Sequence, residues 1–143
     1  MLPEEPEQFK ELCEKVGLAL MMGQKVQFSL AYYYSVYHIV NSGWSKEQAK
    51  DCVNKHLSKA MGFIVSSIEK DAALDEQLFN EIKMFKKDRN WLTHDFDEES
   101  TPYLYKNERF EHYIQEMDRI IECASKLMHN LNQVGEKLVP VDI

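Results

Sequence analysis

The stretch FEHYIQEMDRIIECASKLMHNL, residues 110–131, decides the fold that we expect for this chain. Its apolar side chains recur three or four residues apart and form one stripe: Phe110, Ile114, Met117, Ile121, Ala124, Met128 and Leu131. That spacing is typical of the buried face of an α-helix, whereas a half-buried strand alternates apolar and polar residues. The stretch therefore predicts a long amphipathic helix that packs on other helices.

Helical spacing extends toward the N-terminus. A first helix is expected from near Pro6, with Gly23 as a candidate divider from a second helix. The buried positions of the first helix are expected to be Phe9, Leu12, Val16 and Leu20. The segment VQFSLAYYYSVYHIV, residues 26–40, is apolar or aromatic on nearly every side. We therefore expect this segment to lie deep in the protein, in its core or against a second subunit.

The middle of the chain predicts two further helices. Ser45 and Gln48 have the spacing of a capping box, so a helix is expected from there toward Glu69. Another helix is expected over residues 75–91, followed by a polar, proline-containing link at residues 97–108 that packs on the body of the protein. An extended tail is expected from about residue 137.

Turn-forming residues are scarce, since the 143 residues include only five glycines and four prolines. Few turns favour a few long helices over many short strands. The fold class that we expect is all-α, a bundle of four or five helices in one domain that spans residues 1–143.

Composition limits the partners and the location that we expect. The formal net charge of −7 repels nucleic acids and anionic membranes at long range, so contact with RNA would require a local basic patch. Three widely spaced cysteines are typical of free thiols in a reducing compartment. The first ten residues lack the order of a signal peptide, and the most apolar run, residues 28–40, is too short to cross a bilayer. We expect a cytoplasmic protein without a membrane partner.

A charged residue interrupts the apolar stripe of the predicted helix at 75–91. The stripe is Leu78, Ile82, Phe85, Arg89, Leu92 and Phe96, in which Arg89 occupies a position where the pattern calls for an apolar side chain. A guanidinium in such a position needs hydrogen-bonding partners or water to offset the loss of its hydration. Arg89 is therefore either paired or functional.

Arg89 lies in the segment KKDRNWLTHDF, residues 86–96, together with Asn90 and His94. On a regular helix Arg89 and His94, five residues apart, point about 140° apart, whereas Asn90 and His94 lie about 40° apart. Arg89 and His94 can line one cleft only if the helix ends or bends near Leu92, or if a second element completes the cleft. The alternative is a buried Arg89 paired with a glutamate or a carbonyl, beside an exposed His94.

The residues Arg-Asn-x-Leu-x-His-x-Phe at 89–96 resemble the motif of the HEPN superfamily, an arginine followed by a polar residue and, a few positions later, a histidine. The resemblance implies a helical bundle that dimerises about its motif helices, and a composite Arg/His cleft that cleaves RNA without a metal. Arg89 would bind phosphate, His94 would be the acid or base, and Asn90 would assist them. Some toxins of the superfamily carry a tyrosine, modified by a partner nucleotidyltransferase, where this chain has Phe96.

Other residues near the motif give mixed indications. Lys86 and Lys87 could supply positive potential for an RNA substrate, and Tyr33 could reach Arg89 or stack on a base. Five carboxylates flank the motif at positions 88, 95, 97, 98 and 99, and we interpret them as a solvated helix exit. The histidines and cysteines show no zinc-ligand spacing, so neither a metal nor a cofactor is expected.

Three functions are compatible with these residues. The first is a HEPN-like ribonuclease of the toxin or defence kind, a homodimer in a prokaryotic cytoplasm, with an antitoxin protein as a further partner. The second is a non-catalytic dimerisation or interaction module on the same fold, which the acidic charge favours. The third is a nucleotide- or phosphate-binding protein that uses the same cleft.

Overall fold

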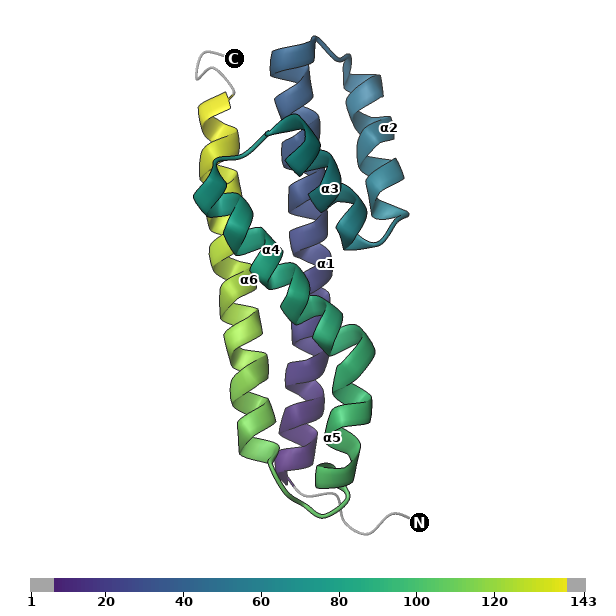
Figure 1. Ribbon diagram of the computed structural model, residues 1–143, viewed down its shortest axis with the longest axis vertical. Helices are drawn as coiled ribbons and strands as arrows, with labels where there is room; N and C mark the ends of the chain where they lie inside the picture. The colour runs from purple at the N-terminus through teal and green to yellow at the C-terminus, as the bar shows by residue number, and fades with distance from the viewer. Residues whose placement is uncertain (1–6, 139–143) are drawn as a thin grey trace.

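The computed structural model describes residues 7–138, and within that range the chain forms helices and no strand (Figure 1). The elements are α1 (Glu7–Ser42), α2 (Lys46–Leu57), α3 (Met61–Asp71), α4 (Glu76–Asn90), a π-helical segment η1 (Trp91–Asp95), α5 (Phe96–Leu104) and α6 (Phe110–Leu138). Because α4, η1 and α5 follow one another without a gap, they form a single bent rod. The predicted all-α bundle is confirmed.

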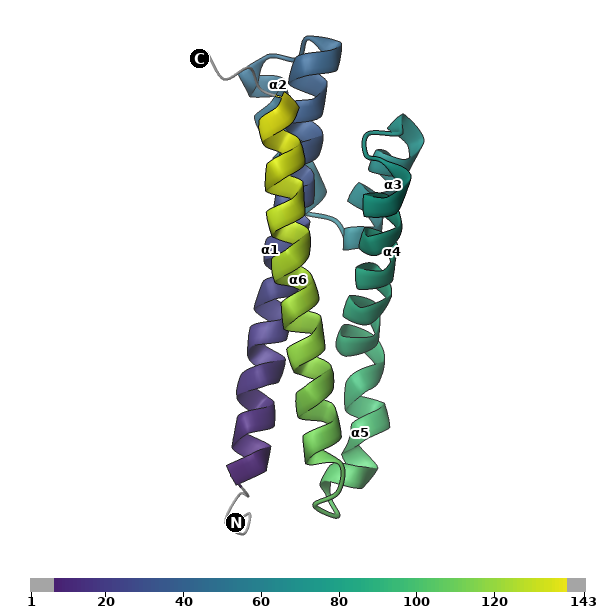
Figure 2. The same cartoon turned by 90° about the vertical axis from the view of Figure 1, so that its left-hand side faces the viewer.

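The helices lie in two layers. Figure 2 shows α1 and α6 side by side along most of the length of the molecule, with α3, α4 and α5 in a second layer against one face of this pair. Contacts between α1 and α6 are the most extensive in the structure, and α2 packs beside α1. The rod α4–η1–α5 crosses the pair obliquely in its first half (Figure 1).

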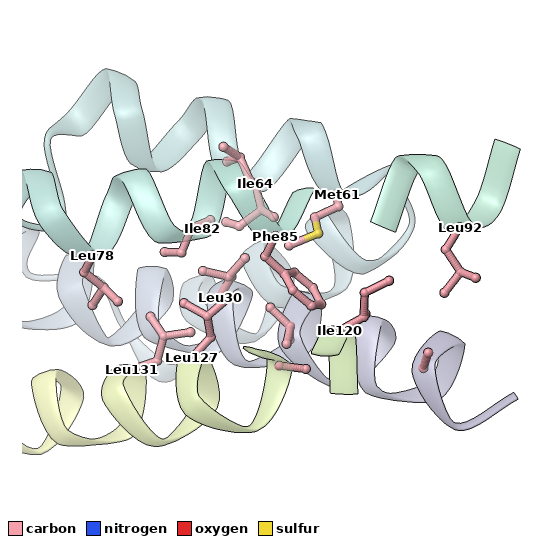
Figure 3. Close-up of a cluster of buried hydrophobic side chains, with 14 of the residues drawn as sticks. Leu30, Met61, Ile64, Leu78, Ile82, Phe85, Leu92, Ile120, Leu127 and Leu131 are labelled. Atoms are coloured by element: carbon pink, nitrogen blue, oxygen red, sulfur yellow. The ribbon is translucent and has the colours of Figure 1, made fainter. Parts of the chain in front are cut away.

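The core lies between the two layers. Figure 3 shows Leu30 of α1, Ile64 of α3 and Phe85 of α4 in one cluster, with Leu127 and Leu131 of α6 on the side of Leu30. Each of these side chains is at most 2% exposed. Burying a side chain of this size contributes about 1.5–3 kcal/mol relative to leaving it in water. Apolar side chains contributed by both layers are buried between them, and this burial holds the two layers together.

The first helix is longer than expected. Gly23 does not divide it, and α1 continues for 36 residues. The glycine is buried, and a Cβ atom at this position would lie 3.3 Å from Cδ of Arg89. Gly23 therefore makes room for a neighbouring side chain and does not end a helix. Leu20, predicted to be buried, is 38% exposed.

The helix predicted from Ser45 toward Glu69 is two helices. The capping box is confirmed, since Ser45 accepts from the backbone of Gln48 and the Gln48 side chain accepts from the backbone of Ser45. The chain then leaves the helix after Leu57 and begins α3 at Met61. The carbonyls of His56 and Lys59, at this break, accept hydrogen bonds from the Gln27 side chain of α1. These bonds offset the free energy lost with the helical hydrogen bonds.

The predicted link at residues 97–108 is largely helical, because α5 covers its first part. The acidic run at residues 97–99 was interpreted as an exit from the helix but instead lies in the first turn of α5. Asn107 and Arg109 have positive φ values of 57° and 64° and turn the chain into α6. Of the two tyrosines in this link, Tyr103 lies under the guanidinium of Arg109, whereas Tyr105 is 84% exposed, so the predicted packing of the link holds only in part.

The predicted C-terminal helix is confirmed as α6, which extends to Leu138. Five of the seven predicted stripe residues are buried, while Ile121 and Met128 are only partly buried. Residues 137 and 138, where the predicted tail would begin, are helical, and the rest of that predicted tail, like Pro6, lies outside the described residues. Of the helices in residues 7–138, none is both long enough and apolar enough to cross a bilayer.

Candidate functional site

The segment that carries the motif contains a π turn. The backbone N–H of Phe96 donates to the carbonyl of Trp91, five residues back, and the Thr93 hydroxyl donates to the Arg89 carbonyl at 2.5 Å. A π turn holds more residues than an α turn, so it brings residues five apart closer to one face. The interruption required near Leu92 is therefore present. Because a π turn holds more residues, the angle between Arg89 and His94 about the helix axis is smaller than the roughly 140° of a regular α-helix.

Arg89 is partly buried between α4 and α1. Its Nη2 donates to Oε1 of Gln27 at 3.2 Å, and its side chain packs against Gly23. Burial lowers the pKa of Arg89, but a guanidinium stays protonated at neutral pH. Within residues 7–138 no carboxylate forms an ion pair with it, and Gln27 is its hydrogen-bond partner. Most of its five N–H donors therefore remain available to a ligand or to water.

The partner of Arg89 also has a structural role. Gln27 is 6% exposed, and its Nε2 donates to the carbonyls of His56 at 3.2 Å and Lys59 at 2.7 Å. One amide therefore joins α4 to α1 and α1 to the connection between α2 and α3. The predicted alternative was a buried Arg89 paired with a glutamate or a carbonyl beside an exposed His94. The structure agrees with much of it, since the acceptor is the side-chain carbonyl oxygen of Gln27, Arg89 is partly buried and His94 is exposed.

The other two predicted catalytic residues lie outside this network. Asn90 and His94 are exposed, and no hydrogen bond joins either of them to Arg89 in the described part of the chain. A single subunit therefore presents the guanidinium and the imidazole on one rod without direct contact between them. A ligand, or a second element, would have to bridge them.

The structure places the three predicted substrate-binding residues differently. Lys87 is exposed, and Lys86 extends over the first turn of α3, where its Nζ lies 3.5 Å from the position that a Cβ of Gly62 would take. Tyr33 is not brought to Arg89. It is 4% exposed, its hydroxyl donates to the Ala73 carbonyl at 2.6 Å, and burial raises its pKa to about 12. It has no free face on which a base could stack.

Two of the five flanking carboxylates accept hydrogen bonds from side chains more than one helical turn away, which reduces their repulsion of an anion, and Asp97 accepts from the nearby Thr101 hydroxyl at 3.4 Å. Asp88 accepts two hydrogen bonds from Arg119 of α6, both at 3.0 Å, and these bonds raise the pKa of Arg119 above its usual range. Glu99 accepts from Nε1 of Trp91 at 3.4 Å and from the hydroxyl of Tyr113 at 3.3 Å. Their charges are therefore partly compensated, and those of residues 95, 97 and 98 remain at the exposed surface.

A second polar cluster was not predicted from the sequence. His38 Nε2 lies 2.8 Å from Oδ2 of Asp71, and the Tyr34 hydroxyl donates to the same oxygen. The hydrogen bonds from Tyr34 and His38 lower the pKa of Asp71, and Trp44 stacks on the His38 ring at 4.3 Å. These residues are distant in the sequence and come together only because α3 ends beside α1.

An open pocket of about 320 Å³ adjoins this cluster between α1, α2 and α3. His56 lies in its wall, with Nδ1 2.8 Å from the Cys52 carbonyl and Nε2 3.1 Å from the Ser67 hydroxyl. Ser67 is also within hydrogen-bonding distance of the Phe63 carbonyl, at 3.1 Å. Both ring nitrogens of the buried His56 thus have partners, which accounts for its burial.

No group of three or more His, Cys, Asp or Glu side chains within residues 7–138 is arranged to hold a metal ion. No protein-family model matches the chain, and no curated protein or solved structure matches it. The resemblance to the HEPN superfamily therefore rests on the motif residues and their arrangement.

Proposed function

We propose that this protein is a HEPN-like, metal-independent endoribonuclease of the toxin or defence kind. The observation that carries the proposal is Arg89, a partly buried cation whose hydrogen-bond partner is a neutral amide and whose remaining donors can bind a phosphate. The adjoining π turn supports it, because π turns occur frequently at functional sites and this one carries His94.

In the proposed reaction Arg89 binds the phosphate oxygens as negative charge builds on them. A ribose 2′-hydroxyl attacks the phosphorus atom, His94 exchanges the protons, and the 5′-oxygen leaves with one proton. The products are a 2′,3′-cyclic phosphate and a free 5′-hydroxyl. Asn90 assists by hydrogen bonding, and the charges of Lys86 and Lys87 on the same helix attract the RNA backbone.

The proposed active form is a homodimer in a prokaryotic cytoplasm, with an antitoxin protein as a further partner. Arg89 and His94 do not touch within one chain, so a second copy that meets the first along α4–η1–α5 would complete a composite Arg/His cleft. Two-fold contacts of this kind are the commonest form of association between identical chains.

One observation favours a second candidate, a non-catalytic interaction module. The contacts of Gln27 with Arg89, His56 and Lys59 give the arginine a purely structural use. The net charge of −7 also opposes the binding of RNA. A nucleotide- or phosphate-binding protein is the intermediate case, in which Arg89 holds the ligand and no bond is cleaved.

The test is cleavage of a mixed RNA substrate by purified protein in excess chelator. We expect His94→Ala and Arg89→Ala each to lower the cleavage rate by about a hundredfold or more, the scale of losing a positioned proton donor or anion-binding group. His129→Ala is the matched control, because His129 is exposed on α6 and lies outside the motif. Its rate is expected to equal that of wild type.

Equal cleavage by wild type and folded His94→Ala would trace the activity to a contaminant and favour the interaction module. Loss of cleavage in Arg89→Ala but not in His94→Ala would leave Arg89 as an anion-binding residue and reject the proton transfer by His94. Circular dichroism of each variant separates loss of the reaction from loss of the fold.

A further inference from the structure

The outer face of α1 carries a mostly apolar stripe that no other helix of residues 7–138 covers. It consists of residues spaced three or four apart, which we call the α1 stripe: Leu18, Met21, Lys25, Phe28, Tyr32, Val36 and Ile39. Phe28 is 50% exposed, Met21 is 58% exposed and Tyr32 is 59% exposed. Except for the step from Tyr32 to Val36, these spacings alternate between three and four residues, the pattern by which helices pair along a seam.

The α1 stripe lies on the side of α1 opposite Gly23 and Gln27, the residues that face α4. Within residues 7–138, the layer formed by α3, α4 and α5 covers the other side of the α1–α6 pair (Figure 2). From Val26 to the end of α1 at Ser42 there is no lysine, arginine, aspartate or glutamate. The exposed side chains of α6 are mostly polar or charged, so the apolar surface of this layer is concentrated on α1.

The size of the surface suits a contact between two copies of this chain. From the exposed fractions of its apolar residues, the α1 stripe presents about 600 Å². That is at the upper limit of the apolar patches found on monomers, and it approaches the roughly 800 Å² that each partner buries in a stable complex. We infer that the α1 stripe is a self-association surface, on which a second copy of this chain docks through its own α1 in antiparallel orientation.

The antiparallel orientation follows from the residues of the stripe. The stripe is nearly symmetric about Phe28, so antiparallel pairing places Leu18 opposite Ile39 and Met21 opposite Val36 of the second copy. It also places Lys25 opposite Tyr32, where the ammonium group can lie over a ring. Parallel pairing about a two-fold axis would instead place Lys25 next to Lys25 of the second copy. Two like charges in contact are destabilising.

The contact through the α1 stripe is separate from the contact that forms the proposed composite cleft. It faces away from Arg89 and leaves α4 and His94 free. A chain that used both two-fold contacts would assemble beyond a dimer, with a closed tetramer as the commonest outcome. The mass of the wild-type assembly therefore reports on both contacts, and the inference does not depend on the proposed function.

The test compares masses by sedimentation equilibrium. Met21→Lys combined with Tyr32→Lys places two charges on the stripe at residues that are already more than half exposed, so the fold is expected to persist. We expect this variant to have half the mass of the wild-type assembly. Leu57→Lys is the control, since Leu57 is 40% exposed at the end of α2, outside the stripe, and is expected to keep the wild-type mass.

If wild type has the mass of two chains and the stripe variant that of one, the α1 contact is supported. If wild type has the mass of four chains and the stripe variant that of two, both the α1 contact and the composite cleft are supported. A wild type with the mass of one chain overturns the inference. So does a stripe variant that keeps the wild-type mass, because α4 or another surface would then hold the copies together.

Cysteine variants test the orientation. In the antiparallel arrangement Phe28→Cys lies close to its own copy, whereas two Leu18→Cys sites are about 30 Å apart along the helices. We expect oxidised Phe28→Cys, and not Leu18→Cys, to form more disulfide-linked dimer than the wild type, which carries the three native cysteines. Linkage of Leu18→Cys alone would establish a parallel contact, and linkage of neither would overturn the proposed seam.

Discussion

Two polar residues that fasten α1 to the second layer differ in how their charges are balanced. Asp71, at the end of α3, accepts hydrogen bonds from Tyr34 and His38 of α1. Arg89, near the end of α4, donates to Gln27 of the same helix α1. The carboxylate is stabilised by its partners, which lower its pKa, whereas burial alone accounts for the lowered pKa of the guanidinium.

This difference separates a structural contact from a candidate site. A charge whose partners stabilise it contributes to folding and has little left to offer a ligand. A charge that has lost water without gaining an opposite charge is held at some cost to stability, and an anion that binds there recovers part of that cost. Arg89 therefore has the features of a binding residue, and Asp71 has those of a structural one.

The largest expected effect on stability comes from removing the amide that holds Arg89. Gln27→Leu leaves the guanidinium and the Lys59 carbonyl without their partner, whereas the His56 carbonyl keeps the hydrogen bond from the backbone N–H of Lys59. We expect the free energy of unfolding to fall by about 2–3 kcal/mol, because each buried polar group without a partner costs about 1–3 kcal/mol. Urea unfolding followed by circular dichroism measures the change.

Gln24→Leu is the matched control for Gln27→Leu, because Gln24 lies on the exposed side of the same helix. Its effect is expected to stay within about 0.5 kcal/mol, as for most surface substitutions. If Gln27→Leu were as mild as Gln24→Leu, Arg89 would not depend on Gln27, and the contrast with Asp71 would no longer hold.

A smaller effect is expected for the paired carboxylate. Asp71→Asn removes the charge that accepts from Tyr34 and His38, and we expect a loss of about 1 kcal/mol at neutral pH, reduced because Asp71 is partly exposed to solvent. The folded-state pKa of Asp71 is lowered, so its stabilising effect is present above the pKa of an unfolded aspartate, about 3.9, and is lost as the pH falls through the folded value.

Urea unfolding of wild type and Asp71→Asn at several pH values measures this dependence. The two stabilities are expected to differ at pH 7, to approach each other as the pH falls below the unfolded value of about 3.9, and to converge only below the lowered folded-state pKa, where Asp71 of the folded wild type becomes protonated. Asp51→Asn, at an exposed position, serves as the control. A difference that is independent of pH would mean that the charge of Asp71 is not what stabilises this contact.

The sequence predicted the helices better than the connections between them. The stripe of α6 and the capping box at Ser45 depend on residues a few positions apart, so local spacing was sufficient to find them. Local spacing does not reveal the break after Leu57, because the residue that stabilises it is remote in sequence. The Gln27 side chain, twenty-nine residues before His56, donates a hydrogen bond to the His56 carbonyl at the break. Gly23 was interpreted as a divider because its neighbour Arg89 is remote in sequence.

The candidate site was predictable to a similar extent. The interruption of the apolar stripe singled out Arg89, which is partly buried beside Gln27. A bend near Leu92 was one of two conditions for Arg89 and His94 to share a cleft, and the π turn lies there. The neutral partner of Arg89, the burial of Tyr33 and the cluster of Tyr34, His38 and Asp71 depend on how α1 meets α3 and α4. No local pattern in the sequence encodes those contacts.

The smallest expected effect on stability comes from filling the space beside Gly23 of α1 that the Arg89 side chain occupies. Replacing a glycine within a helix by alanine stabilises the helix by about 1 kcal/mol. Gly17→Ala should show this full gain, because no atom lies within 4 Å of its added Cβ. Gly23→Ala should gain less, because its Cβ would lie 3.3 Å from Cδ of Arg89, a contact closer than ordinary van der Waals distance.

A double-mutant cycle between Gly23→Ala and Arg89→Ala, measured by urea unfolding, isolates this contact. With Arg89 shortened to alanine, nothing crowds the new Cβ, so Gly23→Ala should then gain as much as Gly17→Ala. The difference between the two backgrounds is the cost of displacing the guanidinium side chain from α1. If Gly23→Ala gains equally with and without Arg89, the side chain moves freely, and the fixed position that the proposed phosphate site requires of it would be lost.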